Sequence, residues 1–232
     1  MEYLPKNIDH VRSRVQAACL RSGRNPGDVS IVGVSKTQPI DAVVKARSLG
    51  VLTFGENYVQ ELLLKHAQDG LEDVSWHFIG HLQSNKVKYI APFVRMIHSV
   101  DSASLALEIS RQAVKFHRTI DILFQVNTSG ESSKSGVEPN DVLSLVRDCI
   151  SLPGIRLCGL MTIPAPVDDA DDVRSEFRLL RELCDSVRTE LSLPSFVELS
   201  MGMSDDYEVA IEEGATIIRP GTALFGSRQA IS

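Results

Sequence analysis

The sequence has few cysteines and no surplus of basic residues, and both shortages narrow the class of protein. Its four cysteines lie far apart in 232 residues and form no Cys-x-x-Cys pair, which argues against a disulfide-stabilised secreted domain and against a cysteine zinc site. The net charge of -6 and the isoelectric point of about 5.5 argue against binding to nucleic acid or to an anionic membrane. The cysteines are Cys19, Cys149, Cys158 and Cys184.

Long apolar runs and low-complexity tracts are also missing. No run approaches the roughly 20 residues of a membrane-spanning helix, and the N-terminal stretch MEYLPKNIDH is too polar for a signal peptide. With 43% hydrophobic and 23% charged residues, the chain has enough apolar surface to bury a sizeable core. We therefore expect one cytoplasmic domain spanning residues 1–232, with reduced thiols and with neither nucleic acid nor membrane as a partner.

Short apolar runs recur along the chain, with helical periodicity between them. The helical spacing is clearest around Phe177, Leu180 and Cys184, where apolar residues lie three and four positions apart. An additional helix is expected before the first run, with Ile8 and Val11 on its apolar face. Eight runs are expected to form strands: 30–35, 51–55, 76–80, 96–100, 120–126, 155–163, 195–200 and 216–221.

Eight strands alternating with helices predict an α/β protein that folds as a single (β/α)8 TIM barrel, which typically needs about 250 residues. A doubly wound open sheet is the competing architecture, but no Gly-x-Gly-x-x-Gly motif follows the first run. In such a barrel the ligand site forms at the carboxyl ends of the strands. The residues that end the runs should therefore meet at one mouth: Lys36, Glu56, Asn57, His81, Gln83, Ser99, Asp101, Asn127, Met161, Thr162, Ser200 and Arg219.

Two features of this predicted mouth suggest its ligand. Lys36 ends the first apolar run, and although a lysine at a strand end ordinarily extends into solvent, a desolvated lysine can form a Schiff base. Gly221 and Thr222 follow the eighth run and Ser200 ends the seventh, and barrels often bind phosphate in the loops after strands seven and eight. The residues alone leave two ligands open: a phosphosugar, or pyridoxal 5′-phosphate (PLP).

Several longer motifs resemble one known family. The motifs VSK, FGENYVQE, WHFIGHLQSNK, VNTSGESSKSGV, GLMTI, LSMGMSDDYEVAI and RPGTALFG are together similar to those of the pyridoxal phosphate homeostasis proteins. These proteins are single-barrel relatives of the N-terminal domain of alanine racemase. The resemblance extends from about residue 30 to residue 226 and implies a fold-type III PLP barrel without a C-terminal β domain.

The resemblance implies a role for each residue around the cofactor ring. Lys36 would hold PLP as a Schiff base, and Asn57 would lie beside the ring. Arg219 would face the pyridine nitrogen. Because arginine stays protonated in proteins, it would donate to that nitrogen, keep it unprotonated and leave the ring a poor electron sink.

The resemblance also implies the phosphate contacts. Ser200, Gly221 and Thr222 would hold the phosphate group. Pro220 departs from the family pattern, in which a branched aliphatic residue is typical, and proline removes one backbone donor beside the turn.

No metal site is expected. His77 and His81 are four residues apart, but on a strand that spacing separates the side chains by about 13 Å. We therefore expect His77 in the core and His81 on the rim. Lys86 and Lys134 are competing amines, but both lie beyond the strand ends. The polar, glycine-rich loop 128–138 could be a mobile lid, although most such loops are simply solvated.

No second catalytic base is evident, and we assign no catalytic residue. A racemase needs a base on each face of the substrate α-carbon, and the related racemases supply a tyrosine from a separate β domain of the neighbouring subunit. This chain ends about six residues after its last motif, so we expect no such domain and a monomer. The predicted function is therefore PLP binding in vitamin B6 homeostasis, with delivery to PLP-dependent apoenzymes as an extension. The alternatives are a weak PLP-dependent amino-acid racemase and a cofactor-free Schiff-base aldolase acting on a phosphosugar.

Overall fold

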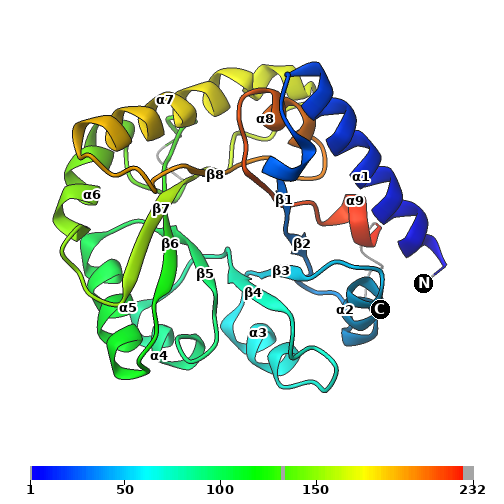
Figure 1. Ribbon diagram of the computed structural model, residues 1–232, viewed down its shortest axis with the longest axis horizontal. Coiled ribbons are helices and arrows are strands. Elements are labelled where there is room, and N and C mark those ends of the chain that lie inside the picture. The colour runs from blue at the N-terminus through cyan, green and yellow to red at the C-terminus, as the bar shows by residue number, and fades with distance from the viewer. Residues whose placement is uncertain (1, 132–133, 227–232) are drawn as a thin grey trace.

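The strands form a parallel barrel that closes through the first apolar run (Figure 1). The structure is a computed structural model that describes residues 2–131 and 134–226. The first run is divided into β1 (Ser30–Ile31), which pairs with β9 (Ile217–Ile218), and β2 (Gly33–Val34), which pairs with β3 (Thr53–Glu56). The two halves of this one strand thus join opposite ends of the nine-segment sheet. This closure confirms the predicted (β/α)8 barrel and is incompatible with an open sheet.

The other strands follow in chain order around the barrel, and each pairs in parallel with the next. The predicted bounds are close to the observed ones, and for residues 96–100 they are identical. These strands are β4 (Ser75–Phe78), β5 (Met96–Val100), β6 (Ile120–Gln125), β7 (Ile155–Met161) and β8 (Glu198–Ser200).

Helices surround the barrel and cover its outer wall (Figure 1). Their apolar stripes face inward as predicted: Phe177, Leu180 and Cys184 of α7 are buried, as are Ile8 and Val11 of α1. The helices are α1 (Tyr3–Arg21), α2 (Ile40–Ser48), α3 (Val59–His66), α4 (Val87–Ile90), α5 (Ala103–Lys115), α6 (Val142–Cys149), α7 (Arg174–Glu190), α8 (Tyr207–Glu212) and α9 (Thr222–Phe225).

Two properties of the chain bear on its class. All four cysteines are buried thiols without a disulfide. Among residues 2–131 and 134–226, no helix has the length and the apolar content that crossing a membrane requires.

The barrel interior has an apolar layer with polar side chains above and below it. Side chains alternate between the interior and the helix-facing wall along each strand. Val32 is an interior residue, and the same alternation would direct Lys36, two positions beyond the end of β2, into the mouth. The apolar layer consists of Val32, Met96, Leu123, Cys158, Met161 and Ile217.

Candidate functional site

Lys36 follows β2 directly and is half-buried. The backbone on both sides of it is held. The Ser35 N–H donates to the carbonyl oxygen of Gly55 at 3.1 Å, and the Thr37 N–H donates to Glu61 Oε1 at 2.6 Å. Thr37 has a φ of 62°, a left-handed conformation that β-branched residues rarely adopt and that persists only where the surroundings enforce it. The lysine is therefore presented from a backbone whose path is already set.

A buried ionic cluster lies behind this segment, between the barrel wall and α3. Lys65 Nζ donates to the Ser35 carbonyl oxygen at 2.5 Å, to Glu56 Oε1 at 2.7 Å and to Glu61 Oε1 at 3.0 Å. The Ser35 hydroxyl donates to Glu56 Oε1 at 2.6 Å. Burial raises the pKa of Glu56, although the Lys65 charge opposes the shift. The prediction that Glu56 reaches the mouth is wrong, because its carboxylate is fully buried and its Oε1 accepts hydrogen bonds from Lys65 and Ser35.

The predicted phosphate turn presents two converging backbone donors. The N–H groups of Gly221 and Ala223 each donate to the hydroxyl oxygen of Ser204 at 3.0 Å, and Thr222 between them is exposed. Convergent N–H groups of this kind suit an anion, and in this structure the Ser204 oxygen accepts from both. Our sequence analysis missed Ser204 as a site residue. It lies in the same LSMGMSDD motif as Ser200, and its position in the loop after the seventh strand was the available signal.

Pro220 does not weaken the turn. Its carbonyl oxygen accepts a hydrogen bond from the Val34 N–H at 3.0 Å, and the two turn donors come from the residues after it. A Cβ atom built on Gly221 would lie 3.6 Å from Val34, which is ordinary van der Waals contact. The departure from the family pattern therefore leaves both convergent donors in place.

Arg219 is almost completely buried at the end of β9. Its Nη1 donates to the Ser200 hydroxyl at 2.7 Å, and its Nη2 donates to the Thr162 carbonyl oxygen at 2.8 Å. Burial lowers the pKa of Arg219 to about 10, while Asp206 opposes that shift, so the guanidinium remains charged at neutral pH. Ser200 was expected at the phosphate, but its hydroxyl bonds to Arg219 and to His98.

Asn57 lies at the end of β3 with its side-chain oxygen buried. Within the described part of the chain that oxygen has no hydrogen-bond partner, and an unpaired buried acceptor costs about 1–3 kcal/mol. Gly80, two residues after β4, lies so close that a Cβ atom there would be 2.3 Å from the Asn57 carbonyl oxygen. Asn57 therefore has a side-chain acceptor that a ligand could use, and its backbone packs tightly against Gly80.

The histidines occupy the expected places. His77 is buried in the barrel interior and His81 is exposed on the rim. Across residues 2–131 and 134–226, no cluster of three or more His, Cys, Asp or Glu side chains could hold a metal ion.

The loop 128–138 is tied to the barrel at both ends. Thr128 Oγ1 donates to Glu176 Oε2 at 2.9 Å, and Val137 forms an isolated parallel bridge with Val126. Ser132 and Ser133, near its centre, lie outside the described residues. Motion of this loop stays a prediction.

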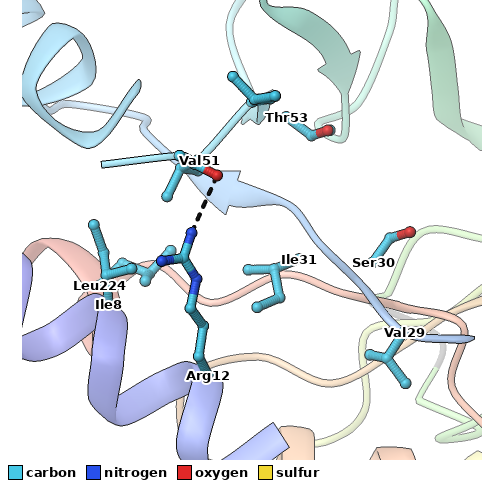
Figure 2. Close-up of a pocket in the computed structure, with 10 residues that line it drawn as sticks. Ile8, Arg12, Val29, Ser30, Ile31, Val51, Thr53 and Leu224 are labelled. Carbon is cyan, nitrogen blue, oxygen red and sulfur yellow. Dashed lines mark hydrogen bonds between the residues drawn. The ribbon is translucent and has the colours of Figure 1, made fainter. Parts of the chain in front are cut away.

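A separate hollow of about 290 Å³ lies beside the amino-terminal ends of β1 and β3 (Figure 2). Arg12 extends from α1 toward the segment before β3 and donates to the carbonyl oxygens of Leu49 and Gly50, both at 3.1 Å. This hollow includes no predicted site residue, and we assign it no part in the site.

Known proteins resemble the chain over nearly its whole length. The family model described as the N-terminal domain of alanine racemase matches residues 7–229. A protein of Aquifex aeolicus named pyridoxal phosphate homeostasis protein is 45% identical over 224 residues, which cover 97% of this chain and 98% of that protein. The crystal structure of an unknown protein from Bifidobacterium adolescentis has a TM-score of 0.90 at 38% identity and covers 96% of this chain and 94% of its own. The structure of PipY of Synechococcus elongatus with PLP bound has a TM-score of 0.81 at 36% identity and covers 93% of this chain and 100% of its own.

Proposed function

The chain belongs to the family of the alanine racemase N-terminal domain and, within it, to the pyridoxal phosphate homeostasis proteins, and from this membership we propose that it binds PLP in intracellular PLP homeostasis. The observation that carries the proposal is the pair of converging donors at Gly221 and Ala223, on the same barrel as Lys36. The solved relative that is described with PLP bound supports it.

The residues present fit this cofactor. The backbone donors of the turn suit a phosphate, and the buried Asn57 oxygen offers an acceptor. The charged Arg219 supplies N–H donors to a ring nitrogen. The proposed binding residues are Lys36, Asn57, Ser200, Arg219, Gly221 and Thr222, joined by Ser204 and Ala223.

When bound, the cofactor would supply an aldehyde suited to Schiff-base formation, and Lys36 would hold it through its side-chain amine. Every other contribution comes from the protein. Ser35 and Thr37 fix the backbone of Lys36, and the turn at Gly221 orients the anionic end of the ligand. Ser200 and Thr162 hold Arg219, whose positive charge opposes protonation of the ring nitrogen.

Arg219 supports a carrier rather than an amino-acid racemase. A ring nitrogen that accepts a hydrogen bond from arginine stabilises a carbanion poorly. The two tyrosines that follow strand ends in the sequence are also poorly suited to serve as a second base. Tyr58 is 59% exposed. Tyr207 is buried, and the guanidinium carbon of Arg14 lies 5.9 Å from the centre of its ring. We assign no catalytic residue.

Three finer points belong to the same proposal. PLP held at Lys36 is protected from free amines, and we propose that it is passed on to PLP-dependent apoenzymes. We propose a monomer, because this barrel mouth is formed by one chain. We also propose a cytoplasmic location, because the four cysteines are free thiols, as is usual in a reducing compartment.

The test is the visible absorption of purified protein incubated with PLP, followed by borohydride reduction and peptide mass spectrometry. We expect a yellow wild type with a pyridoxyl adduct on the Lys36 peptide. We expect no adduct at position 36 in Lys36→Ala and an unchanged adduct in Lys45→Ala, which removes an exposed lysine on α2. A wild type that binds no PLP would refute the proposal. Conversion of D- or L-amino acids by the loaded protein would favour the racemase.

A further inference from the structure

A continuous line of polar side chains crosses the barrel interior below Arg219. The Arg219 guanidinium contacts the Ser200 hydroxyl at 2.7 Å, which contacts His98 Nδ1 at 2.8 Å. His98 Nε2 lies 2.9 Å from His77 Nδ1, and His77 Nε2 lies 3.4 Å from the hydroxyl of Ser75. The five residues come from β9, β8, β5 and β4, and we call them the interior chain. Both histidines are buried.

One direction of the hydrogen bonds satisfies every member of the interior chain. Arginine can only donate, so the Ser200 oxygen accepts from it, and we assign the Ser200 hydrogen to His98 Nδ1 because this gives the hydroxyl an acceptor. His98 must then carry its proton on Nε2 and donate to His77 Nδ1. His77 in turn carries its proton on Nε2, facing Ser75. The tautomers follow from the network, and each donor in the chain has one acceptor.

The hydrogen bonds of the interior chain require both histidine rings to be neutral. Burial lowers the pKa of His98 well below its usual value, and His77 and Arg219 add to the effect. Burial, with a contribution from Arg95, lowers the pKa of His77 to about 3. A cation at His98 would face the Arg219 charge across a single hydroxyl group. Arg219 therefore remains the charged member of the interior chain.

Packing of the barrel interior alone would not require two buried histidines. The neighbouring interior positions are apolar, among them Met96, Leu123 and Ile217, so this part of the barrel accommodates hydrocarbon side chains. Two buried imidazoles in series are costly unless each nitrogen is paired, and here all four ring nitrogens have a polar neighbour.

We propose that His98 is a positioning residue for Arg219. By accepting the Ser200 hydrogen, His98 keeps a lone pair of Ser200 directed at the guanidinium. Ser200 and the Thr162 carbonyl then hold two of the five N–H donors, which sets the direction of the rest of the planar fork. This inference rests on the proposed PLP site, where the fork meets the ring nitrogen, but the interior chain itself exists without a ligand. His98 acts through Ser200 and does not touch the ligand.

The first experiment examines the ligand-free protein. Nitrogen-15 NMR of the histidine rings should show His98 and His77 as neutral Nε2–H tautomers across pH 6 to 8. In Ser200→Ala, which removes the donor to His98 Nδ1, the His98 nitrogen shifts should move toward a mixture of tautomers. An Nδ1–H tautomer or a protonated ring at His98 in the wild type would contradict the assigned direction of the hydrogen bonds in the interior chain and overturn the proposal. This measurement is independent of whether PLP binds.

The second experiment uses PLP labelled with nitrogen-15 in its ring. His98→Leu removes the acceptor, whereas His98→Asn offers an amide oxygen near the position of Nδ1 and a donor on its other side. We expect His98→Leu to form the Lys36 adduct but to bind PLP about tenfold more weakly, the effect of losing one hydrogen bond to a charged group. The ring-nitrogen signal of PLP bound to His98→Leu should shift from its wild-type position, and His98→Asn should restore most of the wild-type signal.

The outcomes separate the two proposals. A wild type that takes up no PLP refutes the proposed function, while the histidine spectra still test the interior chain. A His98→Leu protein with a lower melting temperature but wild-type PLP affinity and ring-nitrogen shift would show a purely structural histidine and overturn the inference. If His98→Leu does not fold, His98→Ala, which also removes the acceptor, takes its place in the comparison with His98→Asn.

Discussion

Lys65 Nζ lies 2.5 Å from the carbonyl oxygen of Ser35, so a buried cation on α3 holds the residue next to Lys36 from outside the barrel. The same ammonium pairs with Glu56 and Glu61, and Glu61 also accepts the N–H of Thr37. Both neighbours of Lys36 are thus anchored to one cluster. The site depends on a lysine that does not line it.

We expect Lys65→Met to destabilise the fold by about 3–5 kcal/mol, because it leaves the buried Glu56 carboxylate without its cation. Urea unfolding measures the change. Adding Glu56→Gln to Lys65→Met removes the stranded charge and should recover part of the loss. Lys45→Met, at an exposed position of α2, is the control and should stay within about 0.5 kcal/mol of the wild type. Equal stability of the two lysine variants would contradict this view of the cluster.

Gly80→Ala should displace Asn57, since the added methyl group would lie 2.3 Å from the Asn57 carbonyl oxygen. Overpacking of this kind costs about 1–3 kcal/mol, and PLP affinity should fall with it. The comparison variant is Gly23→Ala at the end of α1. At Gly23 a Cβ atom would meet nothing within 4 Å, but the φ of 68° makes alanine unfavourable by about 1–2 kcal/mol. The two variants should therefore lose similar stability for different reasons. Titration with PLP should show weaker binding only in Gly80→Ala. Unchanged PLP affinity in Gly80→Ala would contradict a role for Asn57 in PLP binding.

Acid should weaken the junction between α7 and α8. Glu213 is buried, which raises its pKa, but hydrogen bonds from Arg178 and Arg174 outweigh burial and leave the pKa lowered. A carboxylate with a lowered folded-state pKa stabilises the fold above its unfolded value, near 4.3, and this stability is lost as the pH falls through the folded value.

We therefore expect the unfolding free energy of the wild type to decline below about pH 4.3. In Glu213→Gln it should be lower at pH 7 by about 1–3 kcal/mol and should decline less in acid. Glu182→Gln, on the exposed face of α7, should follow the wild type. Parallel pH profiles for wild type and Glu213→Gln would rule out this contribution.

The cysteines should be unreactive in the native state. Burial raises the pKa of Cys184 to about 12 and those of Cys149 and Cys158 to about 11. Because the thiolate is the reactive form, a disulfide reagent at pH 8 should modify the folded protein only slowly and all four thiols in guanidinium. Rapid modification of the folded protein would mean that a thiol is accessible.

The barrel was predictable because it depends on local patterns. Apolar runs separated by helical periodicity identify the strands, and the bounds of β5 agree residue for residue. Alternation along the first strand predicts Lys36 on the same side as the buried Val32, and parallel strands bring their carboxyl ends to one mouth. The turn after the eighth run was recognisable for the same reason, since its two backbone donors, Gly221 and Ala223, lie within three residues of one another.

The hydrogen-bond partners were decided only by the tertiary structure. Ser200 and His98 are separated by 102 residues, and no local pattern relates them. The pairing of Glu56 with Lys65, and of Ser204 with the phosphate turn, likewise depends on how separate segments pack after the barrel closes. Sequence periodicity reports which side of a strand is apolar, whereas a polar side chain selects its partner by distance and direction across strands. The amino-acid sequence by itself thus determined the barrel and the order of its strands, and the packing of distant strands decided which side chains hold the backbone beside Lys36 and the guanidinium of Arg219 in place.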